Sequence, residues 1–277
     1  SNSWVANAYM NYAHSFNDTH NLNVMVGVNG ENFTSDYFSA MRKKLYDEAF
    51  PELNLAYGEM KDAVIDSNTD DHSSAGYFGR INYDYKGIYL LELNGRYDGS
   101  SKFRAGDRWA FFPSFSLGYR FTEEPYWKNL KNMVSNGKLR FSYGEIGNEA
   151  VGSNMFLSTT AAYNVSSLGF MWLDKKGGKR NMFTRPTWVN PSLTWERIQT
   201  KNLGLDLGFL DNEFTLTAEI FERLTKNMLA PGNAIPSAVG ANAPYTNAGE
   251  LRSRGWELTL AWRKQFKKDF GLYSNFS

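Results

Sequence analysis

Long segments of strict period-two alternation are the feature that most limits what this chain can fold into. In residues 77–86 the residues at odd positions are aromatic, aliphatic or glycine, and those at even positions are nearly all polar. The odd positions are Tyr77, Gly79, Ile81, Tyr83 and Tyr85, and the even positions are Phe78, Arg80, Asn82, Asp84 and Lys86. Successive side chains of a β-strand point to opposite faces, so the pattern predicts a strand with one apolar and one polar face. A tight turn at Lys86-Gly87 precedes a second alternating run at 89–98, which predicts a hairpin.

The same alternation recurs along the chain and predicts an all-β protein of about ten strands, of about the length that a tilted strand needs to cross a membrane. The predicted strands lie at 4–14, 22–33, 77–86, 89–98, 109–121, 137–147, 196–209, 213–224, 251–263 and 270–277.

The connections between these strands alternate in length. The short set is 15–21, 86–87, 122–136, 210–212 and 264–269, and the long set is 34–75, 99–107, 148–195 and 225–250. Antiparallel neighbours joined in sequence put alternate connections at opposite ends of a sheet. The parity therefore predicts long loops at one end and mostly short turns at the other, as in outer-membrane β-barrels.

Composition excludes several other classes of protein. With 30 Lys and Arg against 29 Asp and Glu, the formal charge of +1 argues against a nucleic-acid partner. The absence of cysteine excludes disulfides and thiolate metal sites. No apolar run reaches the length of a transmembrane helix, but membrane β-strands never need one because only alternate residues face lipid.

No residue pattern indicates covalent chemistry, so we expect neither an enzyme nor a cofactor, and we assign no catalytic, cofactor-binding or metal residues. The three histidines, His14, His20 and His72, form no recognisable Ser-His-Asp arrangement. The acidic segment 66–72 reads as a loop without EF-hand spacing, and calcium binding there stays open. Residues 35–50 show a helical period and predict a short helix packed on the loops.

Three aromatic residues in the predicted long loops are candidates for substrate contact: Trp172, Trp188 and Tyr245. Such rings stack on sugars or hold peptide side chains, but they equally pack loops against one another through buried area. Both interpretations remain open at this stage.

Several motifs resemble one family closely. They are Gly79 to Gly87 (GRINYDYKG), Arg96 to Phe103 (RYDGSSKF), Arg108 to Ser114 (RWAFFPS), Leu139 to Gly144 (LRFSYG), Asn190 to Glu196 (NPSLTWE), Asn247 to Glu250 (NAGE) and Gly255 to Leu258 (GWEL). In this order they are similar to SusC/RagA-type TonB-dependent outer-membrane transporters of Bacteroidetes. The resemblance covers roughly residues 76–277, and residues 1–75 fit only as generic barrel and loop.

The resemblance implies a transmembrane antiparallel β-barrel of about 22 strands that encloses a plug. It also implies outer-membrane import of glycan fragments or peptides, energised by the TonB system, with a SusD-like surface lipoprotein as partner. Nothing in the chain resembles the plug. We therefore expect residues 1–277 to be part of one β-barrel domain in contact with outer-membrane lipid, with the plug and the remaining strands outside this sequence.

Two alternatives remain open from the sequence. One is a complete small outer-membrane barrel that acts as a passive pore or adhesin. The other is a soluble carbohydrate-binding β-sandwich. Against the sandwich, side chains such as Arg80, Asp84 and Glu92 would have to fill a dry core, at a cost of several kcal/mol for each unpaired charge.

Overall fold

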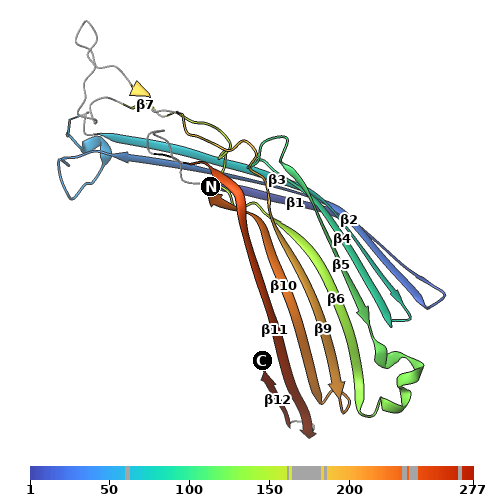
Figure 1. Ribbon diagram of the computed structural model, residues 1–277. Coiled ribbons are helices and arrows are strands. Elements are labelled where there is room, and N and C mark those ends of the chain that lie inside the picture. Colours follow the sequence, from blue (N-terminus) through green and yellow to red (C-terminus); the bar gives the residue numbers. More distant parts are fainter. Residues whose placement is uncertain are drawn as a thin grey trace.

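The computed structural model describes residues 1–59, 63–160, 162–163, 182–183, 186–232, 236, 243–267 and 270–277. Ten antiparallel strands form one curved sheet in the order β1-β2-β3-β4-β5-β6-β9-β10-β11-β12 (Figure 1). Their bounds are β1 Asn2–Phe16, β2 His20–Met41, β3 Val64–Tyr85, β4 Tyr89–Ser100, β5 Trp109–Tyr119, β6 Val134–Asn148, β9 Glu196–Phe209, β10 Phe214–Pro231, β11 Tyr245–Lys267 and β12 Phe270–Phe276. The prediction of about ten long antiparallel strands is confirmed.

Smaller elements lie in the connections between these strands. Two-residue strands β7 (Ala162–Tyr163) and β8 (Met182–Phe183) pair with each other between β6 and β9. The short helices are η1 Leu53–Leu55, η3 Phe121–Glu123 and η4 Pro125–Leu130. Within the described residues no helix is long and apolar enough to cross a membrane.

The pairing register keeps the predicted faces separate across the sheet. One row of directly paired residues runs through eight strands and is apolar throughout: Leu22, Tyr83, Leu91, Leu117, Phe141, Leu203, Ile220 and Trp256. The adjacent row, on the other face, is polar through six strands: Asn23, Asn82, Glu92, Ser116, Ser142 and Asn202. A register slip of one residue would exchange these faces, so the alternation disfavours any slip by an odd number of residues.

Tight turns close the short connections. Asn17 (φ 50°) and Asp18 (φ 52°) join β1 to β2, and Lys86 (φ 55°) and Gly87 (φ 65°) join β3 to β4. Positive φ at both central residues matches the right-handed twist of the flanking strands. Both turns are closed by an i to i+3 hydrogen bond, at 3.2 Å from Thr19 N to Phe16 O and at 3.0 Å from Ile88 N to Tyr85 O.

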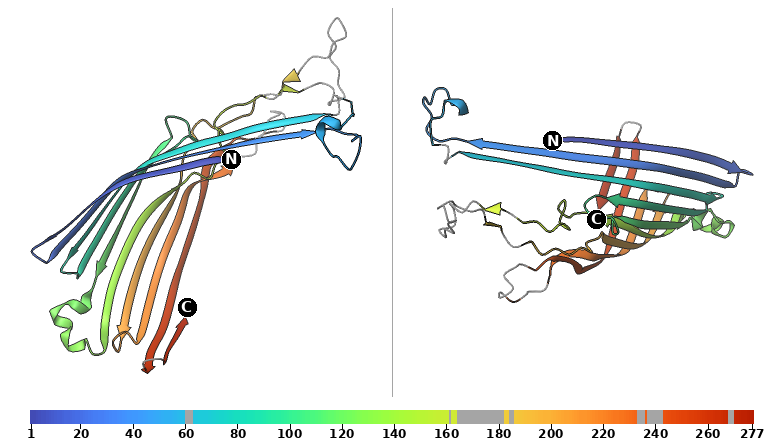
Figure 2. Two further views of the ribbon diagram at one scale, coloured as in Figure 1. Left: turned by 180° about the vertical axis from the view of Figure 1, so that it is seen from behind. Right: turned by 90° about the horizontal axis from the view of Figure 1, so that it is seen from above.

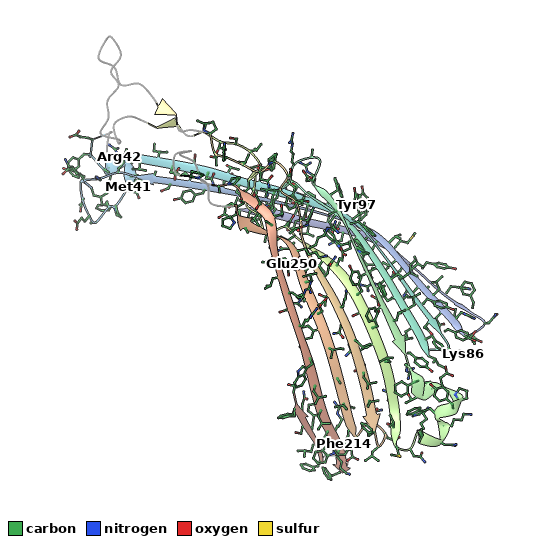
Figure 3. The ribbon with its side chains drawn as sticks, in the orientation of Figure 1. Met41, Arg42, Lys86, Tyr97, Phe214 and Glu250 are labelled. Carbon is green, nitrogen blue, oxygen red and sulfur yellow. The ribbon has the colours of Figure 1, made fainter. Side chains whose placement is uncertain are left out.

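The two kinds of connection lie at opposite ends of the sheet, as the parity predicts. Figure 3 places Lys86 and Phe214 at the end with the short turns, and Met41 and Glu250 at the end with the long connections. The long connections are 42–63, 101–108, 149–195 and 232–244. The connection 120–133 is the exception to the parity, because it holds η3 and η4 and is longer than the connection 101–108 at the opposite end.

The predicted helix at 35–50 and the predicted loop at 66–72 are both wrong. Strand β2 continues to Met41 and β3 begins at Val64, so residues 34–41 pair with 64–71 in an unbroken register. The paired ends of β2 and β3 extend well past the neighbouring strands (Figure 2). The apparent helical spacing was overridden by pairing with β3, which provides partners for those backbone groups of 35–41 that face β3. The described residues contain no group of three or more His, Asp or Glu that could hold a metal ion.

The sheet is open in the part of the chain that the structure describes. The strand order is linear from β1 to β12, and no second large sheet packs on it. A β-sandwich is therefore wrong, and so is a barrel closed by these ten strands alone. Unpaired edges at β1 and β12 would expose backbone donors and acceptors, which is costly in hydrocarbon.

Candidate functional site

The polar face of the sheet is a wall of paired charges and amides. On β3 and β4, Arg80 Nε donates to Asn94 Oδ1 at 2.7 Å, and Asn94 Nδ2 donates to Glu92 Oε1 at 2.8 Å. Arg96 donates to both carboxylate oxygens of Asp98, at 3.0 and 2.8 Å. These charges satisfy one another while remaining open to solvent, which suits a wet surface and not a dry core.

A second network crosses β6, β9 and β10 on the same face. The register pairs Arg140 with Gly204 and Gly204 with Glu219, so the Arg140 guanidinium reaches across β9. It donates to Glu219 and, at 3.0 Å, to Asp206 Oδ2. Asn202 Nδ2 donates to the other Glu219 oxygen at 2.7 Å. One cation bridging two carboxylates makes this part of the polar face a fixed, hydrogen-bonded lining.

The apolar face carries two aromatic groups. The turn-end aromatic group is Tyr85, Tyr89 and Tyr119, with ring centroids 6.3 and 5.1 Å apart. The loop-end aromatic group is Tyr77, Tyr97 and Trp109, where the Trp109 ring stacks 5.1 Å from Tyr97 and 6.1 Å from Tyr77.

The spacing of the two groups matches a membrane. Trp109 and Tyr119 are ten residues apart on β5. At a rise of about 3.3 Å per residue and a tilt of about 40°, they are separated by about 25 Å along the membrane normal. Outer-membrane barrels show an apolar band of about this height between aromatic girdles.

Buried aromatic side chains fasten the long connections where these join the strands. This loop-base cluster consists of Phe103, Ala110, Phe112, Val151 and Trp195, with Met155 and Leu229 packed against it. The Trp195 ring lies 5.1 Å from Phe103 and 5.5 Å from Phe112. A Cβ at Gly147 would overlap the Phe112 ring, so only glycine lets the ring lie on β6. The cluster joins the connections 101–108 and 149–195 to β5 and β10.

Polar bonds complete the loop-base cluster. Trp195 Nε1 donates to Arg108 O at 2.8 Å. Glu196 accepts from Leu229 N at 2.7 Å and from Asn148 Nδ2 at 2.8 Å, which ties β9 to β10 and β6. Several of these residues come from the motif blocks at 96–103, 108–114 and 190–196, so in this structure these three blocks help to position the loops.

Strands β5 and β6 separate near the loop-base cluster. Their pairing covers only Ser114–Tyr119 against Leu139–Gly144, and β5 then leaves β6. Arg197 Nη1 donates to Phe111 O at 3.3 Å and to Glu145 Oε2 at 3.0 Å. The guanidinium therefore satisfies a carbonyl that the sheet no longer pairs.

An ionised carboxylate holds the turn between β9 and β10 against β11. Glu213 Oε1 accepts from Trp262 Nε1 at 3.0 Å and from Lys264 Nζ at 2.9 Å. These bonds, that from Trp262 first, hold the pKa of the Glu213 carboxyl below its ordinary value. Arg263 N also donates to Glu213 O at 2.8 Å, so the turn is anchored at two points.

We expect Glu213→Gln to reduce the acid sensitivity of the intact protein. A lowered folded-state pKa stabilises the fold above the unfolded value of about 4.3, and this stabilisation is lost as pH falls through the folded pKa. Urea unfolding midpoints at pH 6 and pH 3.5 measure the effect. The midpoint should fall less in the variant than in the wild type, and an equal fall would contradict the assigned role of this carboxylate.

Two of the three candidate substrate contacts lie in the part of the chain that the structure describes. Trp188 lies in the connection before β9 and is 53% exposed. Tyr245 is 46% exposed but is the first residue of β11, paired with Pro231, and so does not lie in a loop. Trp172 lies outside the described residues. Neither described ring belongs to the loop-base cluster.

Sequence reasoning assigned no role to two features of the site. The network of Arg140, Asp206 and Glu219 joins strands that are distant in sequence. The sequence indicated it only through the polar residues at alternate positions of those strands. The loop-base cluster also went unassigned, although its motif blocks were recognised. Their position at both ends of the long connections was the available signal.

A curved antiparallel sheet with a polar face, an apolar band between aromatic groups, and long loops at one end defines a segment of an outer-membrane β-barrel. A family model described as TonB dependent receptor-like, beta-barrel, matches residues 1–277. The chain belongs to this family, and its place is the outer membrane, which its strands cross repeatedly.

Relatives and solved structures agree with this assignment. TonB-dependent receptor SusC of Bacteroides thetaiotaomicron is 30% identical over 267 residues, which are 95% of this chain and 25% of that receptor. Receptor P39 of Formosa agariphila is 28% identical over 256 residues, 91% of this chain and 23% of that protein. The chain thus spans about a quarter of the length of these relatives.

Among solved structures, the RagAB peptide importer in its closed-closed state has a TM-score of 0.85 at 22% identity, over 99% of this chain and 29% of that one. The siderophore receptor PirA from Acinetobacter baumannii has a TM-score of 0.56 at 13% identity, over 99% and 36%. At these identities the likeness is one of fold.

Proposed function

We propose that the intact protein imports nutrients across the outer membrane as a TonB-dependent transporter, and that this chain forms part of its barrel wall. The observation that carries the proposal is the polar row from Asn23 to Asn202, which backs an apolar row across the same strands. Such a wall separates lipid from a water-filled lumen.

The proposed cargo is a glycan fragment or a peptide. Its supports are the relationship to SusC and the fold shared with a peptide importer. The proposal includes a SusD-like surface lipoprotein at the loop end, and a plug and further strands outside this sequence through which the TonB system acts. It assigns no covalent chemistry to this chain.

Energy dependence tests this function. The gene for the intact protein is deleted in its native host, and growth is measured on glycans or peptides as the sole carbon source. Growth on the cognate nutrient should be lost and should return with the intact gene only when the TonB system is active. Uptake that persists without TonB would identify a passive pore instead.

We expect Trp172→Ala to weaken uptake without abolishing assembly, with Trp188 and Tyr245 as secondary contacts. One aromatic contact contributes about 0.5–1.5 kcal/mol beyond its buried area, by analogy with aromatic pairs. The measurement is transport divided by surface abundance in the intact transporter. Unchanged uptake per folded molecule would make Trp172 a loop-packing residue, and a collapse in abundance would make its role structural.

A further inference from the structure

A depression crosses the apolar face of β3, β4 and β5. Gly79, Gly95 and Pro113 are direct partners there, so three neighbouring strands carry no long side chain in one row. The same row continues through Val26 on β2 to Met10 on β1. The result is a groove of about 670 Å³ whose lining is almost entirely apolar.

Aromatic rings form the loop-side wall of this groove. Tyr77, Tyr97 and Phe111 are paired in the adjacent row and line it. A Cβ at Gly95 would lie 3.2 Å from the Phe111 ring, so that ring covers part of the floor. A Cβ at Gly79 would meet no atom closer than 3.6 Å, so the floor at Gly79 is left open by the protein.

The depth of the groove identifies its surroundings. Gly79 is two residues from Tyr77 in the loop-end aromatic group and six from Tyr85 in the turn-end aromatic group. The groove therefore lies inside the hydrocarbon band and nearer to the loop end, which in these barrels is the outer leaflet. This face points to lipid in a barrel, so neither a plug nor a lumenal ligand reaches it.

We infer that the groove binds one acyl chain of an outer-leaflet lipid. Water does not fill an apolar hollow in hydrocarbon, and an unfilled hollow forfeits the dispersion contacts of its lining. A flexible methylene chain restores those contacts, and the groove crosses five strands, or about 19 Å, which suits a fatty acyl chain. The phenols of Tyr77 and Tyr97 at the loop side suit the polar linkage where such a chain meets its headgroup.

Filling the floor with a side chain tests the inference. The intact transporter is reconstituted in dimyristoyl phosphatidylcholine, and lipid retained after detergent extraction is counted by native mass spectrometry. The tightest-held lipid should decline about tenfold in Gly79→Leu, because the new side chain displaces roughly two methylene groups from contact. The matched control is Ala218→Leu, which places the same leucine side chain on the apolar face of β10 and should leave that lipid bound.

Every outcome decides the inference. Equal retention in wild type and Gly79→Leu overturns it, as does equal loss in Gly79→Leu and Ala218→Leu. If Gly79→Leu instead separates an oligomer into protomers, with lipid unchanged, the groove is a protein contact and the inference is wrong. Should Gly79→Leu fail to assemble, Gly79→Ala takes its place with a smaller expected loss, since the structure has room for its Cβ.

Discussion

Trp195→Ala should lower the free energy of unfolding of the intact protein by about 3–5 kcal/mol, the cost of deleting a large buried aromatic side chain. Trp195 is only 5% exposed and contacts Phe103 and Phe112. The variant also removes the donor to Arg108 O. Denaturant unfolding in lipid vesicles measures the loss, and limited proteolysis should show earlier cleavage in the connections 101–108 and 149–195.

Trp188→Ala is the matched control for this prediction. It deletes the same side chain from the same connection, but from a position that is 53% exposed. Its effect on stability should stay within about 0.5 kcal/mol, as for surface substitutions in general. If the two variants lose similar stability, the loop-base cluster does not hold the loops as described.

Leu93→Arg should destabilise the inserted barrel by about 2–4 kcal/mol, the cost of a cation on the lipid face at the bilayer midplane. Leu93 lies on the apolar face of β4, four residues from Tyr89 and four from Tyr97. It is therefore midway between the two aromatic groups. The measurement is the free energy of unfolding from lipid vesicles, together with the folded fraction in the outer membrane.

Asn94→Arg places the same charge one residue further along β4, on the opposite face. The pairs of Asn94 with Arg80 and Glu92 show that this face already accommodates ions. We expect a much smaller loss than for Leu93→Arg. Equal losses from the two substitutions would show that the lipid and lumen faces are assigned the wrong way round.

The strands and the loop-base cluster have different structural roles in this part of the barrel wall. The strands must keep charge off the lipid face, and the loop-base cluster must hold the long connections at the mouth. Failure in the first task should reduce insertion, whereas failure in the second should loosen the loops while the strands remain. A transport defect is informative about substrate contact only where neither loss is found.

The sequence by itself determined the strands, their faces and the parity of their connections. This was possible because the side-chain period of a strand is two. Apolar residues such as Tyr83 and Leu91 therefore mark the apolar face, and polar residues such as Asn82 and Glu92 mark the polar face. The turn at Lys86-Gly87 was equally readable, because few residues tolerate positive φ. The motif blocks also identified the family that the whole-chain match then confirmed.

The tertiary structure alone decided how far strands extend and which distant groups meet. Residues 35–41 carry a helical period, yet they are strand because residues 64–70 pair with them and satisfy the backbone groups that face β3. The meeting of Arg140 with Glu219, and of Trp195 with Phe103, depends on the pairing of strands and loops that are separated by tens of residues. Period and propensity are local properties, whereas these contacts follow from register across the sheet, so no local pattern in the sequence specifies them.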